Sequence, residues 1–346
     1  MNWPELLSSL VRGEDQAASA TSWAMGQILS GDATSAQMAA FVMGLRSKGE
    51  TVEELTGLAD VMIEFATPIE IGGPAVDVVG SGGDRSNTVN ISTMAAIVAA
   101  AAGARVVKHG NRAASSACGA ADVLEALGVV LDLTPAAQQH VVDQVGIGFL
   151  FAAHYHPALR HAGPMRRELG IPTTFNFLGP LANPAQPISQ AVGVADPRMA
   201  ELMAGVFAAR GNYGLVVHGG DGLDELTTTT SSTVWLYADG DVERMELDPL
   251  QLGVSRASLS DLVGGDPATN AQVVRDVVAG KPGPIRDVVA LNAAAALVAY
   301  GKPAAGRLEE DFAQELGRAR ETIESGAAQT KLQEWVEATQ SVPESG

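Results

Sequence analysis

Glycines, hydroxyls and an aspartate follow the first β-branched run of this 346-residue chain. The run Val78-Val79-Gly80-Ser81-Gly82-Gly83-Asp84 leads from a predicted strand into a loop, and Thr88, Asn90, Ser92 and Thr93 follow at the mouth of a predicted helix. Glycine lets backbone N–H groups approach an anion closely, and a helix N-terminus adds unpaired donors. The segment therefore predicts a phosphate-binding loop, although it is neither a Walker loop nor a Rossmann fingerprint. A tight strand-to-helix turn is the alternative.

A basic cluster ends the next predicted strand. Lys108-His109-Gly110-Asn111-Arg112 is followed by Ser115-Ser116. In a doubly wound sheet the carboxyl ends of neighbouring strands face one crevice, so this cluster should share its crevice with the glycine loop. Two cations, an amide and two hydroxyls predict a ligand with more than one phosphate. A solvated basic turn is the alternative.

Carboxylates follow a later predicted strand, in Gly219-Gly220-Asp221-Gly222-Leu223-Asp224-Glu225. Mg²⁺ is usually held by one or two protein oxygens, with substrate phosphates and water completing its octahedron. An acidic pair on a loop is commonly just solvated. The two anion-binding elements nevertheless favour a metal that accompanies a charged substrate.

Histidines and arginines form a fourth group. His154-Tyr155-His156-Pro157 carries two histidines, but no third metal ligand stands near them in sequence, so interior or wall histidines are a better interpretation than zinc. Arg166 should lie on a helix beside a domain junction, where a guanidinium suits bidentate capture of a carboxylate. An ordinary surface arginine is the alternative.

Hydrophobic periodicity divides the chain into two parts. Only helices are predicted before residue 67, over 3–10, 15–29, 35–46 and 52–63. Thr67-Pro68 and Gly72-Gly73-Pro74 then interrupt regular structure. We therefore expect a small helical domain at residues 1–67, joined by about 165–186. A hinge near 68–74 should connect it to a larger α/β domain built from 75–164 and 187–346.

Beyond the hinge, short β-branched runs alternate with helical segments. Strands are predicted at 75–79, 105–108, 129–131, 191–194, 215–218, 233–237 and 242–246. Helices are predicted at 92–102, 120–127, 134–144, 157–169, 271–279, 285–300, 308–324 and 330–339. Strand, crossover helix and strand at this spacing indicate βαβ units around a mostly parallel central sheet.

Charge and composition exclude several partners. Lys and Arg number 22 against 40 Asp and Glu, which gives a net charge of −18, so neither nucleic acid nor an anionic membrane is an expected partner. The longest apolar run, 94–104, is shorter than the ~20 residues of a membrane span. A single cysteine, Cys118, cannot form an intramolecular disulfide, which favours a cytoplasmic protein.

Taken together, these segments closely resemble the anthranilate phosphoribosyltransferase family of tryptophan biosynthesis. The resemblance covers nearly the whole chain, and seven elements occur in the family's order. They are Gly80–Asp84 with Asn90-Ile91-Ser92-Thr93, Lys108–Arg112, Ala121-Asp122-Val123-Leu124-Glu125-Ala126-Leu127-Gly128, Arg166-Arg167-Glu168-Leu169-Gly170, Phe175-Asn176-Phe177-Leu178-Gly179-Pro180-Leu181 with Asn183-Pro184, and Asp224-Glu225.

The resemblance implies a homodimer with the fold of nucleoside phosphorylases and phosphoribosyltransferases and an active site at the hinge. It implies that anthranilate contacts Gly80, Asn111, His156 and Arg166, and that Ser92, Asp224 and Glu225 hold two Mg²⁺ ions, with Lys108 acting electrostatically. Phosphoribosyl pyrophosphate would bind Gly80, Ser81, Gly82, Gly83, Asp84, Thr88, Asn90, Ile91, Ser92, Thr93, Lys108, His109, Gly110, Asn111, Arg112, Ala113, Ala114, Ser115, Ser116 and Ala120. The chain departs from the family at Ser81, which replaces threonine, at Arg85, which replaces glycine, at Ala113-Ala114 and at Cys118.

Two rival functions stay open. A pyrimidine nucleoside phosphorylase would share the fold and Lys108-His109, but those enzymes carry a Ser-Thr-Gly-Gly type of sequence where this chain has Gly110-Asn111-Arg112, and they need no Asp-Glu pair. A noncatalytic relative that binds nucleic acid would need a basic face and a degraded Asp-Glu motif, whereas this chain is acidic and keeps Asp224-Glu225.

Overall fold

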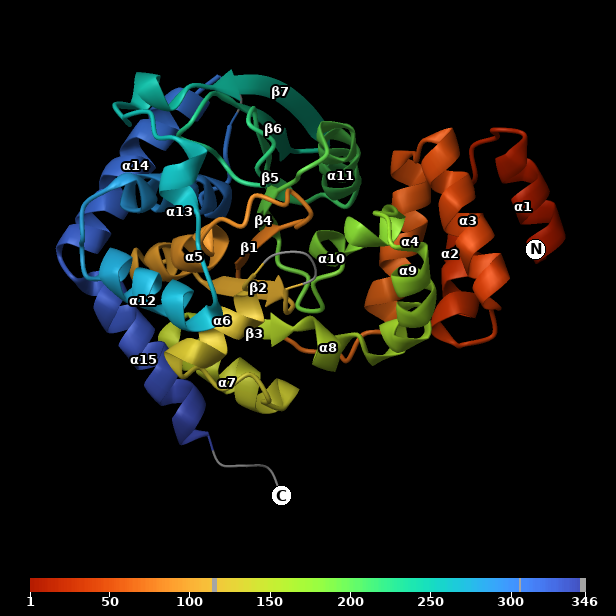
Figure 1. Ribbon diagram of the computed structural model, residues 1–346, viewed down its shortest axis with the longest axis horizontal. Coiled ribbons are helices and arrows are strands. Elements are labelled where there is room, and N and C mark those ends of the chain that lie inside the picture. The colour runs from red at the N-terminus through yellow and green to blue at the C-terminus, as the bar shows by residue number, and fades with distance from the viewer. Residues whose placement is uncertain (114–116, 305, 343–346) are drawn as a thin grey trace.

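A computed structural model describes residues 1–113, 117–304 and 306–342. Four helices come first: α1 (Trp3–Val11), α2 (Ala18–Leu29), α3 (Ser35–Lys48) and α4 (Val52–Glu64). Thr34 and Thr51 begin α3 and α4 as capping boxes, in which a threonine side chain and a Gln or Glu three residues later satisfy each other's backbone amides. These helices form a bundle set to one side of the rest of the chain (Figure 1).

One seven-stranded sheet organises the remainder. Its strands lie in the order β3-β2-β1-β4-β5-β6-β7. They are β1 (Val76–Gly80), β2 (Val106–Gly110), β3 (Ile147–Phe151), β4 (Ser189–Gly193), β5 (Tyr213–Gly219), β6 (Ser232–Ala238) and β7 (Asp241–Leu247). In this order, each strand from β3 to β5 pairs in parallel with the next one. The last two strands are antiparallel, because β6 pairs with β5 and β7 pairs with β6 in opposite directions. The predicted fold class, a small helical part and a larger α/β part around a mostly parallel sheet, is confirmed.

Helices cover one face of the sheet and form the larger core. That core joins Val78, Ala191 and Leu215 of the strands to the helices. The helices are α5 (Ile91–Ala101), α6 (Ala120–Leu127), α7 (Pro135–Val145), α12 (Pro267–Val278), α13 (Pro284–Tyr300), α14 (Leu308–Glu324) and α15 (Ala327–Ser341). Successive strand residues point to opposite faces, so Val79 and Val192, the neighbours of Val78 and Ala191, belong to a different core.

This second core joins the other face of the sheet to the helical bundle. It contains Val79, Val192 and Trp235 from strands, together with α11 (Pro197–Ala209) and the four N-terminal helices. The segment 162–182 belongs to it as well, through α9 (Gly163–Leu169) and α10 (Leu178–Leu181). Figure 1 shows α9 against the bundle and α10 between the bundle and the sheet. The same apolar surface therefore links the two parts of the chain.

Several predicted elements need correction. Residues 129–131 form no strand, and the strand of this region is β3, an uninterrupted apolar run whose periodicity does not distinguish a strand from a helix. The predicted helix at 157–169 is a 3₁₀ turn (Pro157–His161) followed by α9, because Pro164 lacks an N–H and starts a new helix. Helix α11 has no counterpart among the predicted elements, although Asp196-Pro197 is a regular helix start.

The short elements complete the path of the chain. They are α8 (Ala152–Tyr155) and three further 3₁₀ turns at Thr174–Asn176, Pro249–Leu252 and Leu259–Leu262. Within the described residues, no helix combines the length and the apolar character needed to cross a membrane.

Candidate active site

The carboxyl ends of the five parallel strands lie at one end of the sheet. Gly80 at the end of β1 pairs with Gly193 at the end of β4, and Gly193 pairs in turn with Val217 of β5. From β1 the chain proceeds to β2 on one side, whereas β4 lies on the other. Such a switch point leaves a crevice outside the strand ends, where open α/β sheets bind ligands.

The glycine loop begins at this switch point. Gly82 and Gly83 adopt φ of 69° and 91°, a left-handed backbone that glycine accommodates without strain. The Ser81 N–H donates to Gly193 O (2.8 Å), and the Ala195 N–H donates to Ser81 Oγ (3.1 Å). Serine therefore ties the loop to the segment after β4 with the hydroxyl that threonine would also supply.

Arg85 extends the left-handed backbone beyond the glycines. It has φ of 59°, and Asn87 has φ of 50°. A left-handed residue other than glycine costs about 1 kcal/mol, and asparagine is among the residues that tolerate this conformation best. At Arg85 the departure from glycine therefore puts a residue with a side chain into a conformation that glycine adopts without strain.

The acidic pair reaches the glycine loop from a distant part of the sequence. The Gly82 N–H donates to Asp224 Oδ2 at 2.6 Å. A Cβ added at Gly80 would lie 2.3 Å from that oxygen, and one added at Gly193 would lie 1.6 Å from Asp224 O. The absence of a Cβ at the ends of β1 and β4 therefore leaves space for Asp224. Gly193 was not among the predicted site residues, because a glycine at a strand end has no distinctive signal in sequence.

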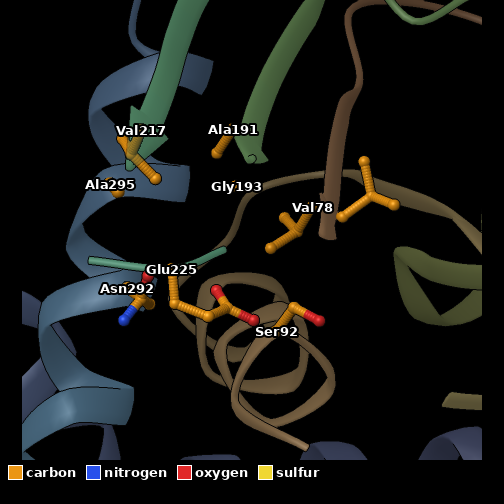
Figure 2. Close-up of a pocket in the computed structure, with 9 residues that line it drawn as sticks. Val78, Ser92, Ala191, Gly193, Val217, Glu225, Asn292 and Ala295 are labelled. Carbon is orange, nitrogen blue, oxygen red and sulfur yellow. The ribbon is translucent and has the colours of Figure 1, made fainter. Parts of the chain in front are cut away.

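Burial and neighbouring negative charges raise the pKa values of both acids. Asp224 is 9% exposed, and burial, followed by the charge of Asp84, raises its pKa to about 6. Burial and the charge of Asp224 also raise the pKa of Glu225, while a backbone hydrogen bond from Ser92 lowers it. Figure 2 shows the Glu225 carboxylate directed toward Ser92 at the start of α5. A cation placed here would relieve the repulsion.

Carboxylate and hydroxyl oxygens are the donors that Mg²⁺ prefers, so Ser92, Asp224 and Glu225 fit that ion chemically. Among the described residues no group of three or more His, Cys, Asp or Glu side chains is arranged to hold a metal. A site of two acids and a serine needs oxygens from a substrate or water to complete its coordination.

Lys108 brings a positive charge beneath the crevice. It is buried on β2, and its Nζ donates to Val78 O and to Ser92 Oγ, the latter at 3.1 Å. Burial lowers its pKa, and the charges of Asp77, Glu225 and Asp224 oppose that effect. The ammonium group is therefore placed beside both predicted metal-binding elements.

The two predicted ligand histidines lie in the interior. His109 Nδ1 is 3.0 Å from Gly179 O, and His156 Nε2 is 2.9 Å from Ala182 O, so each ring donates to a carbonyl of the segment that contains α10. Their ring centroids are 5.1 Å apart. Burial, followed by the neighbouring His156, lowers the pKa of His109 to about 3, so the ring stays neutral. Both rings therefore anchor residues 179–182 beside the sheet.

Asp77 is a buried acid that the sequence did not single out. Its Oδ1 accepts from the His109 N–H (3.1 Å) and its Oδ2 accepts from Asn183 Nδ2 (2.9 Å), which also donates to Val107 O. Burial raises the Asp77 pKa to about 6, against hydrogen bonds that lower it. A lone acid within an apolar strand gives no local signal of this arrangement.

The raised pKa of Asp77 predicts a pH-dependent stability. An unfolded aspartate titrates near 3.9, so the folded chain, with its Asp77 pKa of about 6, binds this proton more tightly, and its contribution to the free energy of unfolding grows as the pH falls from about 6 to about 4. Relative to Asp77→Asn, the protein should gain on the order of 2 kcal/mol between pH 7 and pH 4. Urea titrations of both proteins at several pH values would measure this difference. A constant difference would contradict the shift.

The loop after β2 is anchored by Asp122. Its Oδ2 accepts from the N–H groups of Ala113 (3.0 Å) and Gly119 (2.9 Å) at the two ends of the loop, and its Oδ1 pairs with Arg112 Nη1 (3.0 Å). Arg112 also pairs with Glu125, so its guanidinium already has two carboxylate partners on α6. Ala120 begins that helix. The predicted residues Ala114, Ser115 and Ser116 lie outside the described residues.

The start of α5 presents backbone more than side chains. Ile91 and Thr93 are 1% and 0% exposed, so only their backbone could meet a ligand, whereas Thr88 and Ser92 are half-buried. Asn90 Nδ2 donates to Cys118 O (3.0 Å), and Asn90 Oδ1 accepts from Asn270 of α12 (2.9 Å). Through these two hydrogen bonds, Asn90 connects the start of α5 to the loop after β2 and to α12.

Asn111 and Arg166 are the remaining residues predicted to contact anthranilate. Asn111 is exposed at the end of β2, and its Oδ1 accepts from the Arg112 N–H (2.8 Å). Arg166 is half-buried on α9, with its Cζ 5.8 Å from the Phe175 ring. Within the described part of the chain, its guanidinium makes no ion pair. Burial lowers its pKa, so an anion would stabilise this guanidinium.

The helical bundle, the α/β part and this strand-end crevice define a glycosyltransferase of two domains. The family model "Glycosyl transferase family, helical bundle domain" matches residues 4–66, and "Glycosyl transferase family, a/b domain" matches residues 72–329. The anthranilate phosphoribosyltransferase of Nocardioides sp. is 57% identical over 337 residues, covering 97% of this chain and 98% of that protein. This chain belongs to the anthranilate phosphoribosyltransferase family.

Solved structures agree with this assignment. The anthranilate phosphoribosyltransferase of Thermus thermophilus superposes with a TM-score of 0.90 at 38% identity, covering 97% of this chain and 99% of that one. The enzyme from Saccharomyces cerevisiae in complex with PRPP and Mg has a TM-score of 0.88 at 26% identity, with 98% of both chains covered. The resemblance stated from the sequence is confirmed.

Proposed function

We propose that the protein transfers the 5-phosphoribosyl group of phosphoribosyl pyrophosphate to the amine of anthranilate, giving N-(5-phosphoribosyl)anthranilate and pyrophosphate in tryptophan biosynthesis. The observation that carries this proposal is the contact between Gly82 of the glycine loop and Asp224 of the acidic pair. This contact supports the proposal because the loop amides proposed for phosphate and a carboxylate proposed for Mg²⁺ lie within hydrogen-bonding distance of each other. A nucleoside phosphorylase would have no use for the acidic pair.

Phosphoribosyl pyrophosphate is assigned to the crevice outside β1 and β4. The backbone of Gly80–Asp84, the start of α5 and the end of β2 surround that crevice, and Lys108 lies beneath it. Loop amides and a helix N-terminus suit the pyrophosphate. Arg112, engaged with Asp122 and Glu125, would organise the loop after β2 and leave direct phosphate binding to the backbone there.

Ser92, Asp224 and Glu225 would hold Mg²⁺, with two ions as the proposed number. When bound, the ions neutralise the negative charge that develops on the departing pyrophosphate. Asp224 and Glu225 provide the anionic oxygens, and the Gly82 N–H keeps the Asp224 carboxylate facing the loop. A relative whose structure contains PRPP and Mg supports this assignment.

Anthranilate is assigned to the bundle side, where Arg166 would bind its carboxylate and Asn111 and Gly80 would border it. His156 would act from the interior, because its ring is 5% exposed and binds Ala182 O. It orients the segment of α10 instead of facing solvent. The amine is a neutral nucleophile, so no residue is assigned as general base.

The transfer follows from the charges around the crevice. As the C1–O bond breaks, positive charge builds on the ribose and negative charge on pyrophosphate, which Lys108 and the loop amides stabilise. The anthranilate amine bonds to C1 from the opposite face, and the proton that its nitrogen then loses is taken up by the released pyrophosphate. Positioning and electrostatics provide most of the catalysis, and closure of the bundle over the sheet edge would exclude water.

Domain boundaries, assembly and location complete the proposal. The small domain would comprise residues 1–67 and about 165–186, with a hinge near 68–74 that lets it move against 75–164 and 187–346.

We also propose a homodimer in the cytoplasm. Light scattering of the purified protein would measure the assembly, and a mass of one chain would refute the dimer.

Loss of anthranilate fluorescence tests the function directly. Purified protein mixed with anthranilate and phosphoribosyl pyrophosphate should consume the fluorescence only when Mg²⁺ is present. Folded protein that leaves the fluorescence unchanged under these conditions would refute the proposed reaction.

Arg166→Ala should raise the KM for anthranilate about 10- to 100-fold and leave that for phosphoribosyl pyrophosphate nearly unchanged. A hydrogen bond between charged groups contributes about 1.5–3 kcal/mol, which corresponds to this factor. Initial rates with each substrate varied in turn would separate the two constants. Arg167→Ala is the matched control, because Arg167 is exposed on the same helix. Equal rises in both KM values would contradict the assignment.

A further inference from the structure

Asn292 of α13 binds both backbone polar groups of one distant residue. The Leu226 N–H donates to Asn292 Oδ1 (3.0 Å), and Asn292 Nδ2 donates to Leu226 O (2.8 Å) and to Val288 O (2.9 Å). The side chain is buried, with the residue 5% exposed. The Asn292 amide therefore forms with Leu226 the pair of backbone hydrogen bonds that a neighbouring β-strand would form.

Leu226 directly follows the acidic pair, and the opposite end of the turn is held as well. Asp221 Oδ1 accepts from the Leu223 N–H (3.2 Å), and Asp221 Oδ2 accepts from Thr227 Oγ1 (2.7 Å). The acidic turn, residues 221–226, is thus fixed from within by Asp221 and from the core by Asn292. Asp224 is buried and Glu225 is half-buried. Adjacent carboxylates repel each other, so a turn that carries them needs such restraints.

The position of Asn292 in its helix also favours a role outside the helix. Residues 288–299 of α13 are all buried, and Asn292 is the polar one among them. Alanine would favour the helix by several tenths of a kcal/mol and would bury no polar group. Figure 2 shows Asn292 beside Glu225, whose side chain extends from there toward Ser92. An asparagine at this position is therefore explained by its hydrogen bonds to the acidic turn, since α13 itself would be better served by alanine.

We infer that Asn292 is a positioning residue for the metal-binding acids, which fixes the backbone after Glu225 so that Asp224 and Glu225 meet Ser92 and the glycine loop. The inference rests on the proposed function, because it assigns the geometry of the same metal site. Asn292 makes no contact with substrate in this scheme. Its loss should therefore weaken metal binding while leaving anthranilate binding unchanged.

Asn292→Ala should weaken Mn²⁺ binding in the presence of phosphoribosyl pyrophosphate about tenfold, measured from the EPR signal of the free ion. The Mg²⁺ concentration for half-maximal rate should rise by a similar factor, with the KM for anthranilate within twofold of its original value. Amide hydrogen exchange over 221–227 should accelerate. The matched control is Gln190→Ala, because Gln190 is equally buried and bonds Pro187 O and Tyr237 OH away from the acids. It should lower stability without changing Mn²⁺ affinity.

Several outcomes would overturn the inference. Unchanged Mn²⁺ affinity in Asn292→Ala, or a loss matched by Gln190→Ala, would assign Asn292 to general stability. If the alanine variant does not fold, Asn292→Ser must show the same weakening, and the Leu226 amide of the original protein must exchange slowly. Rapid exchange of that amide would also overturn the role. Failure of the original protein to bind Mn²⁺ or to consume anthranilate would instead remove the proposed function, and the inference with it.

Discussion

The double variant Asp224→Asn with Glu225→Gln should lose turnover by about 10³-fold or more at ordinary Mg²⁺ concentrations. Several kcal/mol of charge stabilisation on the leaving pyrophosphate correspond to such a factor. The amides keep the size of the acids, and the new amide oxygen at position 224 could still accept from the Gly82 N–H. Because burial already disfavours the ionised acids, the thermal midpoint should stay the same or rise.

Stopped assays over a range of Mg²⁺ concentrations would measure this loss, with circular dichroism to follow unfolding. The matched control is Glu243→Gln with Glu246→Gln, which removes the same charge from exposed positions of β7. It should retain full activity. An unchanged Mg²⁺ requirement in the Asp224 and Glu225 variant would refute the metal assignment.

Gly193→Ala should lower kcat/KM about 10²-fold or more and destabilise the protein by about 1–3 kcal/mol. The new Cβ would lie 1.6 Å from Asp224 O and 2.3 Å from Asp224 C, so backbone atoms must move. Overpacking of this kind costs about that much stability, and a misplacement of about 1 Å at a catalytic group can cost about 10²-fold in rate.

The matched control for this substitution is Gly317→Ala. Gly317 is exposed within α14, and an added Cβ there would have no neighbour within 4 Å. Alanine at that position should stabilise the helix by about 1 kcal/mol and leave the rate unchanged. If Gly193→Ala kept the original kcat/KM and Mg²⁺ requirement, the close approach of Asp224 to β4 would not matter for catalysis.

Much of the architecture could be predicted from the sequence because its signals are local. The bundle helices have capping residues such as Thr34 and Thr51, and the strands β1, β2, β4 and β5 end in glycines. Strand β3 escaped prediction because its apolar residues show no alternation, and α11 was left unassigned despite its Asp196-Pro197 start. The 157–169 region was wrongly predicted as one helix across Pro164.

The sequence by itself was sufficient to propose which groups carry the chemistry. The glycine loop and the acidic pair are short local segments that each follow a strand, and Lys108 lies near the carboxyl end of β2. Their residue types and the parallel sheet were therefore sufficient to predict them at one end of the sheet. The family was also recognisable, because these segments occur in its order along the chain. No distance between them was needed for either conclusion.

Only the tertiary structure decided what holds those groups in position. Gly193 touches Asp224, Asn270 binds Asn90, and Asn292 binds Leu226, across separations that no periodic pattern records. Arg112 likewise has its partners on α6, and the two histidines turn toward the interior. The physical reason is that a buried amide or glycine fits its position because of the backbone group that packs against it in the folded protein. That group can come from any part of the chain.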